Sequence, residues 1–173
     1  MPAPDPVKVR YARAGDAVVL ALQGRVHYAF GSRLRAFFDE LSERLRGAKL
    51  FVDLRSVEAI DSTGMGLLAR LGLAARERGR GAVIVCSNDD VCLCLHSAAF
   101  GELFEFSERW PFDETLVLGE VPLGASGVTE EQLGPVMLEA HRDLAALSDQ
   151  NRRTFADVIA ALESACKAPN PAH

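Results

Sequence analysis

Cysteine pairs, long apolar runs and basic clusters are all missing from this sequence. Its four cysteines, Cys86, Cys92, Cys94 and Cys166, form no CxxC pair, and no two histidines have the spacing of a zinc site. The spacing therefore argues against a disulfide framework and against a metal centre. We expect reduced thiols, no metal and no bound cofactor.

The missing apolar runs bear on location. No run approaches the roughly 18–20 residues of a membrane span, and the opening MPAPDPVKVR lacks the apolar core of a signal peptide. We therefore expect a cytoplasmic protein with no membrane segment. The net charge is −5, and no basic region is interleaved with aromatic residues, which argues against nonspecific nucleic-acid binding.

The apolar content is high enough for a folded core. Of the 173 residues, 49% are hydrophobic and 25% charged, which suits one domain with an appendage. Short apolar segments alternate with segments of helical spacing, and a turn at Gly15-Asp16 joins the first two. This order predicts an α/β domain with a mainly parallel sheet, made mixed by the opening hairpin. The predicted strands lie at 7–11, 18–22, 50–54, 82–86 and 103–106. The predicted helices follow Ser32, Asp61 and the pair Ser87-Asn88, either of which can cap the third helix.

The strand and helix patterns of the chain change after residue 107. We expect a domain over 5–107, a linker over 108–128 with one short strand at 115–118, and a helical extension over 129–167. The extension carries an apolar stripe whose register shifts near Asn151, so either one long helix or a helical hairpin fits. Pro135 either interrupts the first turns or opens the main helix.

The stretch 57–68, VEAIDSTGMGLL, places an acid, two hydroxyls and two glycines between a predicted strand and a predicted helix. Backbone N–H groups are unpaired where a helix begins, so Asp61 or Ser62 would cap it, which is worth about 1 kcal/mol. The same N–H groups favour a phosphoryl group on Ser62, which would add about −1.5 to −2 charges beside Asp61. Gly64 and Gly66 would let a partner's backbone or a nucleotide come close. Two interpretations remain open: Asp61 or Ser62 caps a helix, or the Ser62 hydroxyl is modified.

An enzyme that uses Ser62 as its nucleophile finds little support in the sequence. The GxSxG pattern is absent, and the four histidines show no Ser-His-Asp order. No GK[ST] follows Gly64-Met65-Gly66, so this is not a P-loop. His141 lies in the helical extension, where a lone histidine is usually a surface residue rather than a phosphotransfer site. We therefore expect a protein that is not an enzyme, with no paired base for Ser62.

The order of elements and the motif Asp61-Ser62-Thr63-Gly64 together resemble the STAS family, and within it the bacterial anti-sigma factor antagonists. The resemblance covers about residues 5–107, and Phe51-Val52-Asp53-Leu54 matches the strand that precedes the family's D-S-[ST]-G motif. It implies a STAS-like α/β fold with a mixed sheet of four to five strands and packed helices. The C-terminal helical extension is added to that fold.

The resemblance also implies a function. Ser62 would be phosphorylated by a serine kinase that doubles as an anti-sigma factor, and ATP and magnesium would belong to that kinase. A PP2C-type phosphatase would remove the phosphate. The unphosphorylated protein would bind the kinase and free its client, and phosphorylation would end that binding. Asp61 would orient or polarise the hydroxyl. The other switch residues would be Thr63, Gly64, Met65 and Gly66.

The sequence departs from the family pattern at two places, and both bear on which partners the protein binds. Many antagonists carry an acidic residue where this chain has His27, so His27 is added to the switch residues. Minimal antagonists lack a counterpart of 129–167, which would dock on the domain, form a homodimer or bind another partner. The alternative function is a constitutive STAS scaffold or transporter-associated binding subunit without phosphorylation. In that case Ser62→Ala would leave partner binding unchanged.

Overall fold

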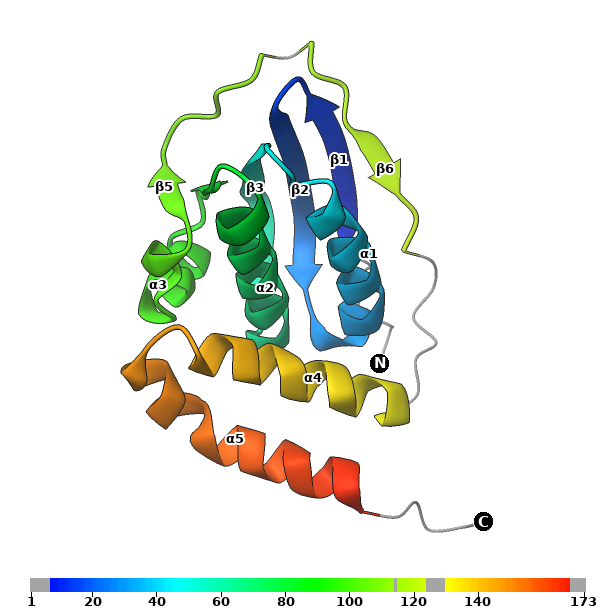
Figure 1. Cartoon of the computed structure of the whole chain (residues 1–173), viewed down its shortest axis with the longest axis vertical. Helices are drawn as coiled ribbons and strands as arrows, with labels where there is room; N and C mark the ends of the chain where they lie inside the picture. The colour runs from blue at the N-terminus through cyan, green and yellow to red at the C-terminus, as the bar shows by residue number, and fades with distance from the viewer. Residues whose placement is uncertain (1–6, 114, 124–129, 169–173) are drawn as a thin grey trace.

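One mixed sheet of six strands forms the centre of the molecule (Figure 1). The structure is a computed structural model that describes residues 7–113, 115–123 and 130–168. The strand order is β5-β4-β3-β2-β1-β6, with β2 to β5 parallel and β1 antiparallel to both of its neighbours. The predicted mixed α/β architecture is confirmed, but the sheet has six strands where four to five were expected. The strands are β1 (Lys8–Ala14), β2 (Ala17–Val26), β3 (Lys49–Ile60), β4 (Ala82–Val85), β5 (Glu105–Ser107) and β6 (Gly119–Val121).

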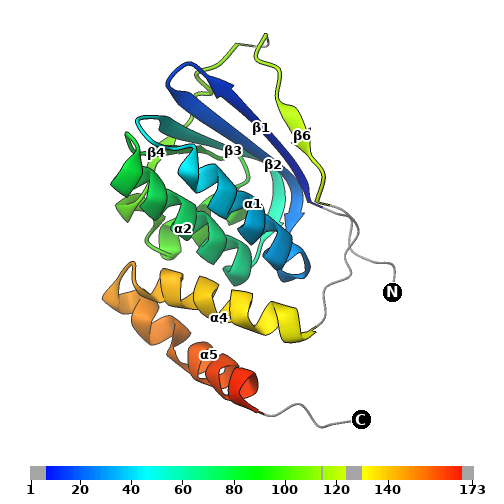
Figure 2. The same cartoon turned by 45° about the vertical axis from the view of Figure 1, so that its right-hand side comes forward.

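Helices α1 (Gly31–Glu43) and α2 (Ser62–Arg78) cover one face of this sheet (Figure 2). They bury their apolar stripes against alternate residues of β2 and β3. Each fully buried side chain of this size contributes roughly 1.5–3 kcal/mol, so this layer dominates the stability of the domain. Its fully buried members include Leu20, Leu22, Leu34, Leu50, Leu54, Leu68 and Leu71.

The opposite face of the sheet is partly covered by the chain that follows β5. Phe51 points to this face, because its neighbours on β3 belong to the core and side chains alternate along a strand. The ring of Phe112 meets Phe51 edge-on at 5.0 Å, and Trp110 lies 5.2 Å from Phe112. The guanidinium of Arg55 lies 5.0 Å from the Trp110 ring centre. The first part of the predicted linker is therefore packed on the sheet.

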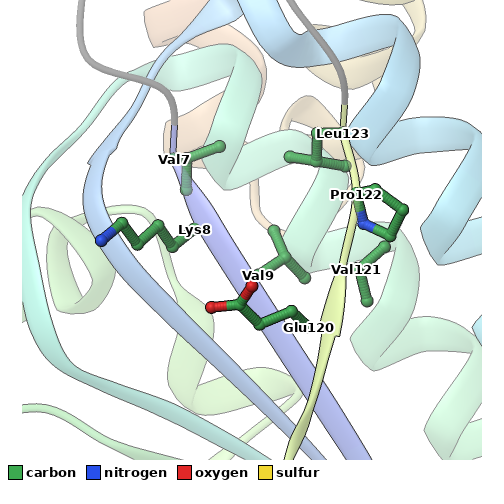
Figure 3. A pocket seen from close by; sticks show the side chains of 7 residues that line it. All are labelled: Val7, Lys8, Val9, Glu120, Val121, Pro122 and Leu123. Atoms are coloured by element: carbon green, nitrogen blue, oxygen red, sulfur yellow. The ribbon is translucent and has the colours of Figure 1, made fainter.

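The sixth strand also comes from that predicted linker. The strand expected at 115–118 is wrong, because the residues that pair with β1 are those of β6. Pro122 follows β6 and has no N–H to continue the ladder. A cavity of about 420 Å³ lies between the start of β1 and this segment (Figure 3). It is lined by Val7, Lys8, Val9, Glu120, Val121, Pro122 and Leu123.

Two other local expectations need correction. Strand β3 runs to Ile60 instead of ending near Leu54, because its second half still pairs with β2 through register shifts on either side of Gly24. Gly24 has φ +87°, which suits a glycine at such an irregularity. Ser32 does not cap α1; its hydroxyl lies 3.4 Å from the carbonyl oxygen of Gln132 in the C-terminal part.

The C-terminal part is a helical hairpin of α4 (Glu130–Ala145) and α5 (Asp149–Lys167), not one long helix. Ser148 is the N-cap of α5, and its hydroxyl accepts a hydrogen bond from the Asn151 N–H at 3.0 Å. Pro135 lies inside α4 and does not open it. Helix α4 crosses the N-terminal ends of α1 and α2, and α5 lies on its far side (Figures 1 and 2). In the described ranges no helix is both long and apolar enough to span a membrane.

The remaining helix, α3 (Asp89–Ser97), follows β4. Asn88 caps it as expected, with its side-chain oxygen accepting from the N–H groups of Asp90 and Val91. Short 3-10 helices, Tyr28–Phe30 and Phe100–Glu102, join β2 to α1 and α3 to β5. Because β2, β3 and β4 are parallel, their carboxyl ends lie at the same edge of the sheet, which is the edge where α2 begins.

Candidate functional site

Asp61 fixes the geometry at the start of α2. It is the N-cap, with an extended backbone, and its Oδ1 accepts from the Gly64 N–H at 2.8 Å. Its Oδ2 accepts from the Tyr28 N–H at 2.7 Å, and its own N–H donates to the Val26 carbonyl at 3.1 Å. One residue thus ties the ends of β2 and β3 to the first turn of α2. The expected helix cap is confirmed, and the capping residue is Asp61.

Ser62, the first residue of α2, has a partner that the sequence did not reveal. Its Oγ lies 2.8 Å from Nε2 of His141 on α4. Nδ1 of His141 lies 2.7 Å from the Met137 carbonyl oxygen, which can only accept. In the neutral imidazole Nδ1 therefore carries the proton, and Nε2 accepts from the Ser62 hydroxyl. The side chain expected to orient this hydroxyl, Asp61, has both oxygens engaged by backbone N–H groups instead.

His141 is only 3% exposed, so the expectation of a surface histidine is wrong. The reason is tertiary: α4 lies against α2, and the ring is enclosed between Ser62 and Phe155 of α5, whose ring centre is 5.7 Å away. The two partners are 79 residues apart in the sequence. No local pattern reports a contact of that separation. A paired base, which Ser62 was expected to lack, is present.

The two glycines of the motif face different neighbours. A Cβ on Gly64 would lie 2.7 Å from a side-chain carbon of Val26, inside the domain itself. A Cβ on Gly66 would lie 2.2 Å from the carbonyl oxygen of Ala140, closer than atoms can pack. Gly66 was expected to allow the close approach of a partner's backbone. The backbone that approaches it is that of the chain's own α4.

The other predicted switch residues take up separate places. Thr63 is buried at 2% exposure. Met65 is half-buried and lines an apolar cavity of about 340 Å³ between α2, α3 and α5, which neither Ser62 nor His141 lines. The ring centres of His27 and Tyr28 lie 4.1 Å apart with the rings tilted by 38°, and His27 Nδ1 accepts from the Ala29 N–H at 3.3 Å. His27 thus belongs to the loop that Asp61 fastens.

Ion pairs join α4 to the outer faces of α1 and α2. Arg35 on α1 lies 2.7 Å from the Glu139 carboxylate, and Arg70 on α2 lies 3.7 Å from Glu139 and 3.6 Å from Asp143. Burial raises the pKa of Asp143, although Arg70 opposes the rise. Asp39, Asp143 and Glu139 raise the pKa of Arg70 against the effect of burial. This side of the contact is therefore electrostatic and half-exposed.

Asn151 holds the other end of the hairpin. It is 2% exposed, and its amide nitrogen donates to the carbonyls of Ala98 at 2.8 Å and Leu144 at 2.9 Å. It thereby links α5 to the end of α3 and to α4. Its position at the register shift of the apolar stripe was the only signal in the sequence. A buried amide at that point is explained by these two carbonyls.

The arrangement permits two kinds of chemistry at Ser62. A serine with a histidine base in reach is the minimum of a nucleophilic pair, but the usual carboxylate behind the histidine is here a backbone carbonyl. A serine at a helix N-terminus also suits phosphorylation. Across residues 7–113, 115–123 and 130–168, no group of three or more His, Cys, Asp or Glu side chains could hold a metal ion.

Comparison with known proteins agrees with this architecture. Residues 9–105 match the family described as "Mlab, STAS domain". A solved anti-sigma factor antagonist from Mycobacterium paratuberculosis superposes with a TM-score of 0.53 at 18% identity, covering 63% of this chain and 92% of that one. Unphosphorylated SpoIIAA, also an anti-sigma factor antagonist, gives 0.49 at 14% identity, covering 58% and 89%. No curated protein matches the chain.

Proposed function

The chain belongs to the STAS-domain family, and from this premise we propose that it is a partner-switching protein of the anti-sigma factor antagonist kind. The binding face surrounds the N-terminus of α2, and Ser62 is the residue whose phosphorylation changes binding. A serine kinase that is also the anti-sigma factor adds the phosphate with its own ATP and magnesium. A PP2C-type phosphatase removes it. The protein works in the cytoplasm, where that ATP is available.

One observation carries the proposal: Ser62 is the first residue of a helix whose start is held rigidly by Asp61. The partial positive charge of a helix N-terminus stabilises a phosphate there. The added charge of about −1.5 to −2 would stand beside the Asp61 carboxylate and change the potential of the whole face. A partner fitted to the neutral hydroxyl would lose affinity by repulsion and crowding.

The same site favours binding over catalysis. Nδ1 of His141 is oriented by the Met137 carbonyl, which stabilises a protonated imidazole less than a carboxylate would. The neighbouring apolar cavity is lined by Met65 and Phe155 and does not reach the Ser62 hydroxyl. These two observations support the proposal that Ser62 accepts phosphate and that the protein is not an enzyme. Covalent labelling of Ser62 by a fluorophosphonate probe would contradict this.

A second function is favoured by one specific observation. The Ser62 hydroxyl is already hydrogen-bonded to a buried side chain, His141, which suits a serine that holds the fold together. The chain would then be a constitutive STAS subunit, such as a scaffold or a transporter-associated binding subunit. Such a subunit keeps the same partner whether position 62 is Ser, Ala or Asp.

Phosphosite mapping on protein purified from its own cells separates the two functions. Partner switching predicts phosphate on Ser62 and a kinase that co-purifies. The purified kinase is then tested against wild type, Ser62→Ala and Ser62→Asp, with Ser164→Asp on the exposed part of α5 as the matched control. We expect wild type, Ser62→Ala and the control to bind, and Ser62→Asp to bind at least about tenfold more weakly. Equal binding by all four contradicts switching.

A further inference from the structure

The face that the proposed function assigns to a partner is already occupied. Helix α4 crosses the N-terminal ends of α1 and α2 (Figures 1 and 2). Its His141 is hydrogen-bonded to Ser62. We propose that the α4–α5 hairpin is an internal competitor for this face, so that kinase and partner reach Ser62 only after the hairpin has moved away. The regulatory meaning rests on the proposed function, whereas the closure itself does not.

The first contact that carries the inference is at the acceptor atom. His141 Nε2 lies 2.8 Å from Ser62 Oγ, and the histidine is 97% removed from solvent. A kinase must bring the terminal phosphorus of ATP to this oxygen along a line free of other atoms. While His141 is hydrogen-bonded to the Ser62 hydroxyl, its ring occupies part of that line of approach. The hairpin therefore lowers the rate at which Ser62 can be phosphorylated.

The second contact excludes simultaneous occupancy. Gly66 lies one turn along α2 from Ser62, and the backbone of Ala140 approaches it so closely that a single added methyl carbon would lie 2.2 Å from the Ala140 oxygen. No external chain can enter a space that does not admit a methyl group. Partner and hairpin must therefore exchange on this face.

The third set of contacts determines what it costs to move the hairpin away. Arg35 and Arg70 pair with Glu139 and Asp143 at the edge of the interface, where the side chains retain between 27% and 43% of their exposure. Such pairs exchange with water at little cost. Val136 and Leu144 of α4 are buried in the core of the domain, so opening also exposes apolar surface. The closed hairpin is therefore the resting form, and opening is the rarer event that a kinase or partner must await or favour.

A thiol placed at the acceptor position reports the opening directly. Ser62→Cys is introduced together with Cys94→Ser and Cys166→Ser, which remove the two exposed native thiols. Cys86 is half-buried, and burial raises its pKa to about 12, so it reacts slowly at neutral pH. Alkylation of the new thiol by N-ethylmaleimide is followed peptide by peptide with mass spectrometry. The closed hairpin predicts slow alkylation in this background.

Gly66→Ala is the variant that opens the hairpin. Alanine favours the helix in which it stands, so α2 itself is not weakened, but its methyl group displaces the α4 backbone. Gly101→Ala is the matched control, because a Cβ there meets no atom within 4 Å. We expect Gly66→Ala to raise the alkylation rate at least about tenfold over the background, and Gly101→Ala to leave it unchanged.

A second pair of variants decides the matter if Gly66→Ala does not fold. Arg70→Glu places a third acidic group beside Glu139 and Asp143 and repels α4. Arg78→Glu makes the same change on the same helix, but Arg78 pairs with Glu43 of α1 and not with the hairpin. Arg70→Glu should accelerate alkylation and Arg78→Glu should not. Circular dichroism and a cooperative urea transition show that each variant is folded.

The result that overturns the inference is an alkylation rate equal in the background, Gly66→Ala and Arg70→Glu, all folded. The measurement needs neither kinase nor partner. Closure can therefore be established in a protein whose Ser62 never carries phosphate, and it can fail in one whose Ser62 does. The outcome of this test and the outcome of phosphosite mapping are independent.

Discussion

Helix α2 has two interfaces, and they are built from different chemistry. On its sheet side it buries Leu67, Leu68 and Leu71 at no more than 2% exposure. On its other side it meets α4 through the Ser62–His141 hydrogen bond, the close contact at Gly66 and half-exposed ion pairs. The first interface is apolar. The second combines these polar contacts with buried apolar side chains of α4, among them Val136 and Leu144, which also belong to the core.

The difference extends to the partner elements. Strand β2 is buried over most of its length and β3 at alternate positions from Leu50 to Leu54, whereas Asn151 is the only buried residue among those the structure describes for α5. Polar contacts exchange protein partners for water at little net cost, whereas buried apolar side chains do not. The α4 interface depends on contacts of both kinds, so we expect the hairpin to open before the sheet domain unfolds.

The largest effect should come from the permanent interface. Leu68→Ala removes a fully buried side chain from the core and should lower the free energy of unfolding by about 2–5 kcal/mol. Leu93→Ala is the control, because Leu93 is 65% exposed and its loss should cost less than about 0.5 kcal/mol. Urea unfolding followed by circular dichroism measures both. Similar losses in the two variants would contradict the assignment of the core.

A smaller and local effect should follow from Asn151→Ala. The variant leaves the Ala98 and Leu144 carbonyls without their donor, which costs roughly 1–3 kcal/mol. We expect faster hydrogen exchange in α4 and α5, with the sheet amides unchanged. Gln150→Ala, at an exposed neighbour, is the control. Uniformly faster exchange across sheet and hairpin would mean that the two regions open as one.

The Ser62–His141 contact itself should show a measurable coupling. A double-mutant cycle of Ser62→Ala and His141→Leu should give an interaction free energy of about 0.5–1.5 kcal/mol, typical of one hydrogen bond. The cycle of Ser164→Ala with His141→Leu should be additive, because Ser164 bonds to Ala160 of its own helix. Additivity in the first cycle would show that the contact contributes nothing to closure.

The smallest effect should come from the charged edge, and it should depend on pH. Burial raises the pKa of Asp143 in the folded protein despite Arg70, so its carboxylate is disfavoured there. That penalty is present above the folded pKa and disappears as the pH falls through it toward the unfolded value of about 3.9. Asp143→Asn should therefore equal or exceed wild type in stability at pH 7.

Thermal unfolding at several pH values checks this last expectation. The advantage of Asp143→Asn should shrink as the pH falls toward about 4. Asp157→Asn, on the exposed side of α5, should stay within about 0.5 kcal/mol of wild type throughout. An Asp143→Asn variant that is less stable than wild type at neutral pH would show that the pair with Arg70 outweighs the effect of burial.

Local sequence patterns predicted the features that depend on residues close together in the chain. The apolar stripes of α1 and α2, the Gly15 turn and the Asp61 cap are each set within a few residues, and the structure has all of them. The length of β3 was not predictable in this way. Arg55 and Ser56 are both exposed, so the alternation of buried and exposed side chains breaks after Leu54, and pairing with β2 extends the strand to Ile60.

The residues of the candidate site also differ in whether a local sequence pattern could predict them. Ser62 and its neighbours stand out because the motif is contiguous, and Asn151 left a trace as an irregularity in an apolar stripe. His141 left none, because its role depends on the placement of α4 across α2, 79 residues away in sequence. The placement depends on Gly66 and Ala140 together, and neither residue alone signals the contact.

We propose Ser62 as a switch that the hairpin covers, and its phosphate occupancy in cells tests both parts of that proposal. Occupancy is measured by mass spectrometry in protein from cells that express wild type, Gly66→Ala or Gly101→Ala. We expect a severalfold higher occupancy in Gly66→Ala than in the other two. Equal occupancy in all three, or no phosphate on Ser62 in any of them, would contradict it.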